Sequence, residues 1–251
     1  MSAPKPIKVL ANADDVIDAL SREGALTPAE IADRVRIPRP SVYRLLDGMH
    51  AIGLTEPLPD SRTRLSLRWL HLADRARAGM REWAGAHGVL ADLVERTGQT
   101  AYLTVLRGDE AVCVDWEQGQ GIGVLVLKPG RTLPLHAGAA GRTLLAFAAD
   151  VDRYLEKGDR RRFTAKTLVD AQDLRADAEA TRSRGFAVSD EDVTDGIGAL
   201  GVPLRTPAGS VIGALSLAGL VADTSSQRDR FLAELRRSAQ ELERNAASAA
   251  R

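Results

Sequence analysis

The sequence predicts an α+β protein built from two domains joined by a helix. Apolar residues recur at steps of three and four through most of the first 53 residues, which is typical of helices. Beyond residue 100, short alternating segments mix with helical ones, which is typical of a sheet flanked by helices. We expect a domain of helices and one hairpin over residues 1–68, a linker helix over 69–79 and an α/β domain over 80–251.

The composition is that of an ordinary folded protein. The 251 residues include 34 basic and 34 acidic side chains, so the formal net charge is zero. The longest nearly apolar stretch, residues 211–222, has 12 residues, whereas a membrane span needs roughly 20. The polar N-terminus does not resemble a signal peptide, and the lone cysteine excludes an internal disulfide. We therefore expect a cytoplasmic protein without a membrane segment.

Two helix-start signals lie in the first 30 residues. Asn12 is a suitable N-cap ahead of Asp14 and Asp15, whose charges complement a helix N-terminus. The stretch TPAE at residues 27–30 has the pattern of a capping box with proline at the first helical position. Two helices are therefore expected, the second of them ending near Pro38.

A third helix is expected to start at Pro40 and to end at Gly53. Arg44 lies opposite its apolar stripe, and its first turn has no acidic residue. A helix that only packs inward and has a polar outside is the alternative interpretation. The residues of the apolar stripe are Val42, Leu45, Leu46, Met49 and Ile52.

A basic β-hairpin follows the third helix. Alternating segments at residues 54–56 and 63–67 flank a Pro-Asp-Ser turn. Arg62 lies at the tip, and Arg64 follows one strand position later. Residues 34–77 contain nine arginines and four acidic residues, which leaves five positive charges. Three short helices and a basic hairpin predict a winged helix-turn-helix that binds duplex DNA.

Duplex DNA is expected to contact the third helix and the hairpin. The N-terminal residues of such a helix reach base edges in the major groove. Arginines on the hairpin contact the backbone or the minor groove. The predicted DNA-binding residues are Arg39, Pro40, Ser41, Tyr43, Arg44, Arg62 and Arg64.

The second domain is expected to contain a mainly antiparallel sheet flanked by helices. Helical patterns cover residues 80–97, 139–149, 174–184 and 226–245, the third pattern ending at Gly185 and the last placing Phe231, Leu235 and Leu242 inward. Strand patterns cover residues 101–106, 111–116, 122–127, 202–204 and 211–217.

The stretch HAGAAGRTLLAF at residues 136–147 indicates an anion site. Small residues precede a helix there, so its first backbone N–H groups are bare. These donors and the helix dipole together favour a carboxylate. The alternative is that the small residues only allow this helix to pack closely on the sheet.

Four stretches spread over both domains follow one another in an order typical of a single family. They are residues 38–46 (PRPSVYRLL), 130–142 (GRTLPLHAGAAGR), 185–192 (GFAVSDED) and 213–219 (GALSLAG). Over nearly its whole length the chain resembles an IclR-type transcriptional regulator. The resemblance implies a winged-helix domain, a GAF-like effector-binding domain, and dimers or tetramers on a partly palindromic operator.

The resemblance also implies where an effector binds. It places contacts at backbone N–H groups, one hydroxyl, apolar walls and the second member of an acidic pair. The residues concerned are Ala139 and Ala140, Ser216, Ile122, Leu125 and Leu133, and Asp190.

Several positions depart from the family pattern. The first member of the acidic pair is Ser189 here, and a cysteine and a second serine are replaced by Ala199 and Ala218. The pocket is therefore less polar than the pattern, which favours a larger or more apolar effector, such as an aromatic one. Pro40 replaces a serine at the start of the third helix, which removes one phosphate contact.

Enzymatic and adaptor functions are the alternatives. The four histidines are scattered, without a zinc-binding pair, and His136 is expected to be a packed histidine. Cys113 alternates inward in a strand and is expected to be buried and inert. Residues 190–192 are interpreted as a solvated acidic loop and not a metal site. We predict no catalytic residue, no metal and no cofactor, and the arginine excess argues against a protein-binding adaptor.

These patterns predict a DNA-binding regulator, with repression favoured over activation. Its partners are double-stranded operator DNA, a small organic effector that is a carboxylate or an aromatic, and further copies of the chain. Effector binding is expected to change half-site spacing through the helix near residues 70–78.

Overall fold

The computed structural model describes residues 6–121, 127–158 and 160–249. The chain divides into two compact units, Met1–Gly79 and Met80–Arg251. Each unit has its own hydrophobic core. Most of the strand expected over residues 122–127 lies outside the described residues.

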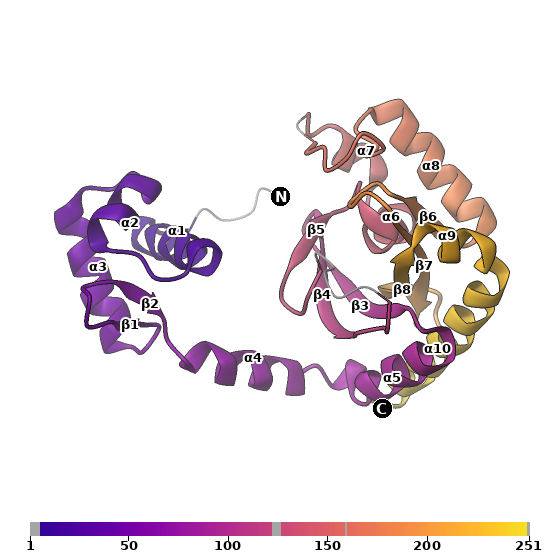
Figure 1. The fold of residues 1–251 in the computed structure, drawn as a ribbon, viewed down its shortest axis with the longest axis horizontal. Helices are drawn as coiled ribbons and strands as arrows, with labels where there is room; N and C mark the ends of the chain where they lie inside the picture. Colours follow the sequence, from indigo (N-terminus) through magenta and orange to yellow (C-terminus); the bar gives the residue numbers. More distant parts are fainter. Residues whose placement is uncertain (1–5, 122–126, 159, 250–251) are drawn as a thin grey trace. The chain divides into compact units, whose positions relative to one another are not determined.

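The first unit contains three packed helices and a two-stranded antiparallel sheet (Figure 1). A further helix, which carries no buried residue, ends this unit. The elements are α1 (Lys8–Glu23), α2 (Pro28–Val35), α3 (Arg39–Ala51), β1 (Thr55–Pro57), β2 (Thr63–Leu65) and α4 (Arg68–Ala78).

The capping box before α2 is confirmed. The Thr27 side chain accepts a hydrogen bond from the Glu30 backbone N–H, and the Glu30 carboxylate accepts one from the Thr27 backbone N–H. The Asn12 cap is wrong, because α1 already begins at Lys8, after Ile7. Residues 8–11 include strong helix formers, which extend the helix by a turn without a side-chain cap.

The inward stripe of α3 is confirmed except at its last member. Val42, Leu46 and Met49 are buried against α1 and α2. Ile52 was expected inside, but its side chain is 56% exposed. The helix ends at Ala51, so Ile52 no longer follows the helical rotation that would place it on the stripe.

The second unit is built on one antiparallel sheet with the strand order β5-β4-β3-β8-β7-β6. The short strands β5 and β6 at its edges were not expected from the sequence, and β7 and β8 are longer than predicted. The strands are β3 (Thr100–Arg107), β4 (Glu110–Glu117), β5 (Thr132–Pro134), β6 (Ala187–Asp190), β7 (Ile197–Arg205) and β8 (Val211–Leu220).

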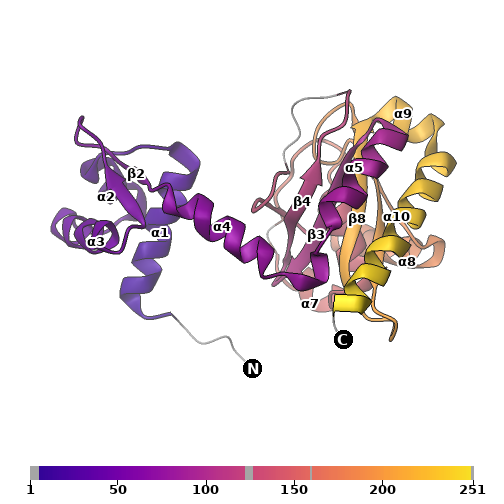
Figure 2. The ribbon, with the colours of Figure 1, turned by 90° about the horizontal axis from the view of Figure 1, so that it is seen from below.

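Helices cover both faces of this sheet (Figures 1 and 2). The expected helix over residues 80–97 is interrupted, because Gly85 adopts a left-handed φ of 77°. The short helices α7 and α9 were not predicted. The helical elements are η1 (Arg81–Trp83), α5 (Ala86–Thr97), α6 (Gly138–Phe147), α7 (Val151–Leu155), α8 (Ala171–Arg184), α9 (Val221–Ser226) and α10 (Arg228–Ala249).

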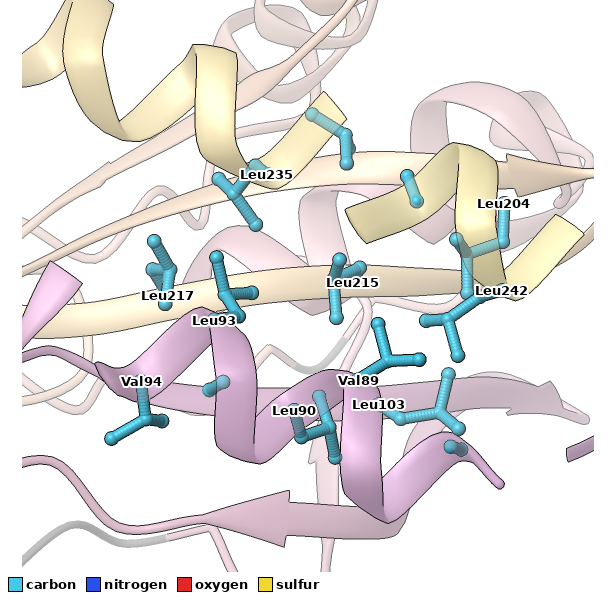
Figure 3. Close-up of a cluster of buried hydrophobic side chains, with 14 of the residues drawn as sticks. Val89, Leu90, Leu93, Val94, Leu103, Leu204, Leu215, Leu217, Leu235 and Leu242 are labelled. Atoms are coloured by element: carbon cyan, nitrogen blue, oxygen red, sulfur yellow. The ribbon is translucent and has the colours of Figure 1, made fainter. Parts of the chain in front are cut away.

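The main core lies between the sheet and the pair α5 and α10. Leu90 and Leu93 of α5 pack toward Leu215 of β8, as Figure 3 shows. Phe231 and Leu235 of α10 are fully buried in the same cluster, as the sequence predicted. This core fixes one face of the sheet against α5 and α10 and leaves the opposite face for other helices.

Helix α6 packs on that opposite face. A Cβ atom at Gly201 of β7 would lie 2.8 Å from the backbone oxygen of Ala139 and 2.6 Å from the Thr143 hydroxyl oxygen. Only glycine therefore allows the start of α6 to approach β7 so closely. The glycine brings the backbone amides of α6 to the surface of the sheet.

Candidate nucleic-acid interface and ligand site

Five of the seven predicted DNA-binding residues lie on the exposed face of α3. Arg39, Pro40, Ser41, Tyr43 and Arg44 are all exposed. Among the described residues, no carboxylate pairs with either arginine. With respect to the described residues, this helix therefore presents two arginines without an acidic partner, together with the Ser41 hydroxyl and the Tyr43 ring.

The hairpin arginines are exposed too, but each already has an acidic partner. An Nη2 atom of Arg62 lies 2.6 Å from Asp60 Oδ2, and one of Arg64 lies 2.6 Å from Glu56 Oε1. The hydrogen bond from the Arg62 side chain lowers the pKa of Asp60, so its carboxylate stays charged. The charge count from the sequence included Asp60 and Glu56 but could not show that they pair with the two arginines. These ion pairs neutralise the positive charge of the hairpin.

A small cavity in the second unit gathers most of the predicted effector-binding residues. Its volume is about 60 Å³, and it lies between the start of α6 and the sheet. Leu133, Ala139, Ala140 and Ser216 line it, as do Ser189, Ala199 and Ala218.

Three predicted residues are not among the lining residues. The Asp190 side chain is 61% exposed and pairs with Lys166 at 3.3 Å, so the structure does not bring it to the cavity. Ile122 and Leu125 lie outside the described residues.

The start of α6 has no side-chain cap. The backbone N–H of Gly138 donates to Asp192 Oδ2 at 3.3 Å. Those of Ala139 and Ala140 have no acceptor within the helix, because the first turn of a helix leaves its N–H groups unpaired. Among the described residues neither amide has a hydrogen-bond acceptor, and both alanines line the cavity, whereas the prediction had all of the first N–H groups bare.

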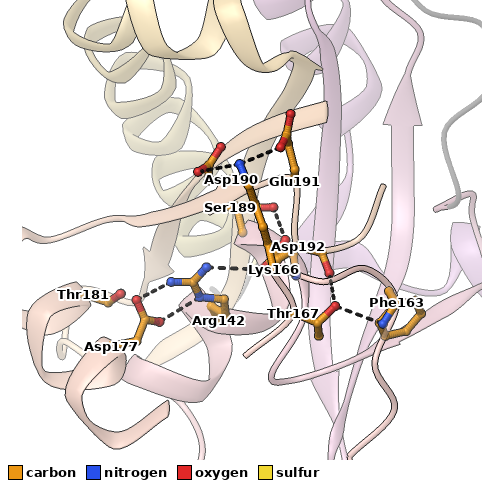
Figure 4. Close-up of polar contacts among 12 residues, drawn as sticks. Arg142, Phe163, Lys166, Thr167, Asp177, Thr181, Ser189, Asp190, Glu191 and Asp192 are labelled. Atoms are coloured by element: carbon orange, nitrogen blue, oxygen red, sulfur yellow. Dashed lines mark hydrogen bonds and ion pairs between the residues drawn. The ribbon is translucent and has the colours of Figure 1, made fainter. Parts of the chain in front are cut away.

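The interpretation of residues 190–192 as a solvated loop is wrong for Asp192, which is buried in an ionic network (Figure 4), and is confirmed for the exposed Asp190. Arg142 Nη1 lies 3.2 Å from Asp192 Oδ2, and Arg142 also donates two hydrogen bonds to Asp177 of α8. The hydroxyl of Ser189 donates to the other Asp192 oxygen. The sequence could not reveal this burial, because the partners come from three separate elements.

Tyr102 of β3 also lines the cavity. From the sequence alone, a tyrosine on this strand can line a pocket but is more often part of the core. The Tyr102 side chain is only 3% exposed, and its ring stacks on Trp116 with centroids 6.2 Å apart. Its hydroxyl has no hydrogen-bond partner among the described residues. Burial raises the pKa of Tyr102, so the phenol stays neutral. An unmet buried hydroxyl costs about 1–3 kcal/mol.

The groups considered for catalysis are engaged elsewhere. His136 Nδ1 lies 2.7 Å from the Tyr154 hydroxyl, and its Nε2 lies 2.9 Å from the Arg161 carbonyl oxygen. Cys113 is 1% exposed, and its thiol donates to the Asp115 carbonyl oxygen. No cluster of potential metal ligands is present in the described part of the chain. The helices described are also too short or too polar to cross a bilayer.

Two known domain families match most of the chain. The IclR helix-turn-helix domain matches residues 9–59, and the family described as the bacterial transcriptional regulator IclR C-terminal domain matches residues 80–244. The chain belongs to the IclR family. An IclR-family protein is a transcriptional regulator with a DNA-binding helix-turn-helix domain and a C-terminal ligand-binding domain, and is not an enzyme.

Curated relatives and a solved structure match this IclR-family chain along most of its length. The regulator BhcR of Paracoccus denitrificans is 32% identical over 85% of this chain and 77% of its own. The probable regulator SauR of Cupriavidus necator is 29% identical over 90% and 92%. An IclR homologue from Microbacterium hydrocarbonoxydans, solved with 4-hydroxybenzoate, superposes with a TM-score of 0.84 at 23% identity, covering 96% of this chain and all (100%) of that one.

Proposed function

We propose that this IclR-family protein is a repressor whose affinity for operator DNA is set by a small carboxylate bound under α6. The observation that carries the proposal is the pair of bare amides, Ala139 and Ala140, facing a cavity. Arg44 of α3 is exposed and has no acidic partner among the described residues, which supports the DNA-binding part.

DNA recognition is assigned to α3 and the hairpin. Ser41, Tyr43 and Arg44 lie in the N-terminal half of α3, which is the part that meets base edges when such a helix enters the major groove. Arg39, just ahead of them, holds a phosphate. Arg62 and Arg64 follow the backbone or the minor groove after they exchange their carboxylate partners for phosphates.

Effector recognition is assigned to the start of α6 and the facing strand β8. A carboxylate accepts hydrogen bonds from the amides of Ala139 and Ala140, helped by the helix dipole. Ser216 supplies a hydroxyl, and Leu133 supplies an apolar wall. The 4-hydroxybenzoate bound by the structural relative is a carboxylate of the class proposed here. Asp190 is left out of this site, because its side chain points to solvent and to Lys166.

Regulation is assigned to a change in half-site spacing. A dimer or tetramer on a palindromic operator fixes the distance between two copies of α3. An effector that binds one arrangement more tightly shifts the population toward it. Helix α4, which follows the hairpin in the chain and buries none of its residues, is the segment through which the change passes.

The test compares Arg44→Ala with Arg175→Ala, an exposed arginine of the second unit that pairs with Asp152. Binding to a duplex that spans the promoter of the protein's own gene is measured at two salt concentrations. Arg44→Ala should lower affinity by at least tenfold, and Arg175→Ala should leave it unchanged. Thermal shift with 4-hydroxybenzoate should be the same for both variants, because the two sites are separate. If the wild-type protein does not bind the duplex at either salt concentration, the DNA-binding assignment is contradicted.

Repression is tested by transcription in vitro from the same promoter. Adding the protein should lower transcript levels, because a bound regulator blocks access to the DNA. A rise in transcript would identify an activator instead.

A further inference from the structure

The hydroxyl of Tyr102 stands out among the buried polar groups of the second unit. It is enclosed by the protein, it lines the cavity below α6, and it has no hydrogen-bond partner among the described residues. Buried hydroxyls usually have a partner, so an exception calls for an explanation. The ring itself is held firmly by its stacking on Trp116, which fixes where the hydroxyl lies.

The sheet places Tyr102 beside Ser216. The two residues are direct partners in the β3–β8 register, so their side chains share the face that α6 covers. The Ser216 hydroxyl also has no hydrogen bond within the described part of the chain. Two unused hydroxyls and two bare amides therefore converge on one cavity from opposite sides, the strands and the helix start.

We propose that Tyr102 is a specificity-determining residue of the effector site, and that the effector is a carboxylic acid with a second oxygen, as hydroxyl or carbonyl, away from its carboxylate. This inference rests on the proposed effector site. The amides of Ala139 and Ala140 hold the carboxylate, and the Tyr102 hydroxyl pairs with the remote oxygen. A carboxylic acid without the second oxygen leaves the Tyr102 hydroxyl without a hydrogen bond, so it binds more weakly than an acid that carries this oxygen.

A first experiment needs no effector. In the ligand-free protein, Tyr102→Phe removes an unmet hydroxyl and keeps the ring, so its melting temperature should rise by about 2 °C or more. The matched control is Tyr154→Phe, which removes a hydroxyl bonded to His136 Nδ1 at 2.7 Å and should lower the melting temperature. A Tyr102→Phe protein that melts at or below the wild-type temperature would overturn the inference, since the hydroxyl would then have a structural partner.

A second experiment measures coupling between the two oxygens. Affinities are measured by calorimetry for two matched pairs, propanoate with 3-hydroxypropanoate and benzoate with 4-hydroxybenzoate. In at least one pair, the wild-type protein should prefer the hydroxylated member by about tenfold. Tyr102→Phe should bring that ratio close to one while leaving the affinity for the plain acid unchanged.

The outcomes separate this inference from the proposed function. If the acids bind and the ratio is the same in both proteins, the role of Tyr102 is overturned while the carboxylate site stands. If none of the four acids binds the wild-type protein, the proposed carboxylate site fails, and the role of Tyr102 fails with it. A ratio that collapses only in Tyr102→Phe, and not in Tyr154→Phe, supports the inference.

Discussion

The carboxylate of Asp192 accepts a hydrogen bond from the backbone N–H of Gly138, with an N–O distance of 3.3 Å. The Asp192 carboxylate therefore already binds the first free N–H group of α6, next to the amides of Ala139 and Ala140, which line the cavity. Arg142 lies 3.2 Å from the same oxygen and offsets its charge. The proposed effector site therefore lies next to a fixed negative charge, which repels an anionic ligand.

Neutralising this charge should strengthen carboxylate binding and weaken the fold. We expect Asp192→Asn to raise affinity for 4-hydroxybenzoate about fivefold, because the repulsion between the two carboxylates is lost. We also expect it to lower the free energy of unfolding by about 1–3 kcal/mol, because Arg142 loses the buried one of its two carboxylate partners. Calorimetry and urea denaturation measure the two effects.

The control for this prediction is Asp190→Asn. That side chain is 61% exposed and lies outside the cavity, so the variant should change neither quantity. An Asp192→Asn protein with unchanged carboxylate affinity would show that the internal anion does not repel the ligand.

Releasing a hairpin arginine should strengthen DNA binding. Glu56→Gln removes the acidic partner of Arg64. Arg64 can then bind a DNA phosphate without first breaking an ion pair. Exposed ion pairs are weak, so we expect affinity for duplex DNA to rise only about two- to fivefold, with a steeper dependence on salt. Fluorescence anisotropy at several salt concentrations measures both.

Asp152→Asn is the matched control, since it frees the exposed Arg175 of the second unit without touching the hairpin. An equal gain in both variants would mean that net charge, and not the hairpin, determines the affinity. A loss of affinity in Glu56→Gln would mean that the ion pair shapes the hairpin for DNA.

His136 should make stability depend on pH in the mildly acidic range. Burial lowers its pKa below the ordinary value of about 6.5, although the hydrogen bond to the Arg161 carbonyl opposes this. The unfolded chain therefore binds a proton first as pH falls. The contribution is fully present above pH ~6.5 and is lost between that value and the lower pKa of the folded state, with a slope of at most about 1.4 kcal/mol per pH unit.

Urea denaturation between pH 5 and 7.5 tests this dependence. His136→Asn should be less stable at neutral pH but should show a flatter profile below pH ~6.5. The exposed His71 provides the control, and His71→Asn should keep the wild-type slope. A wild-type slope in His136→Asn would assign the dependence to other groups.

Local signals in the sequence predicted much of the fold. The TPAE stretch specified the start of α2 because both capping partners lie within four residues of each other. The end of α8 at Gly185 was also predicted, because glycine adopts the left-handed conformation that follows a helix at no steric cost. Edge strands β5 and β6, with three and four residues, were missed because such short segments lack a readable alternation and are strands only through their neighbours.

The sequence by itself indicated the family, the exposed face of α3 and the uncapped start of α6, because each of these depends on short stretches of neighbouring residues. It did not reveal that Asp192 accepts a hydrogen bond from the first amide of α6. Only the tertiary structure decided that Ser189, and not Asp190, faces the cavity, and that Asp192 is buried while Asp190 is exposed. It also decided that the Tyr102 hydroxyl has no hydrogen-bond partner in the part of the chain that the structure describes. The physical reason is that the burial and pairing of a polar side chain depend on groups from elements distant in the sequence. A local sequence pattern does not show which of these groups pack against it.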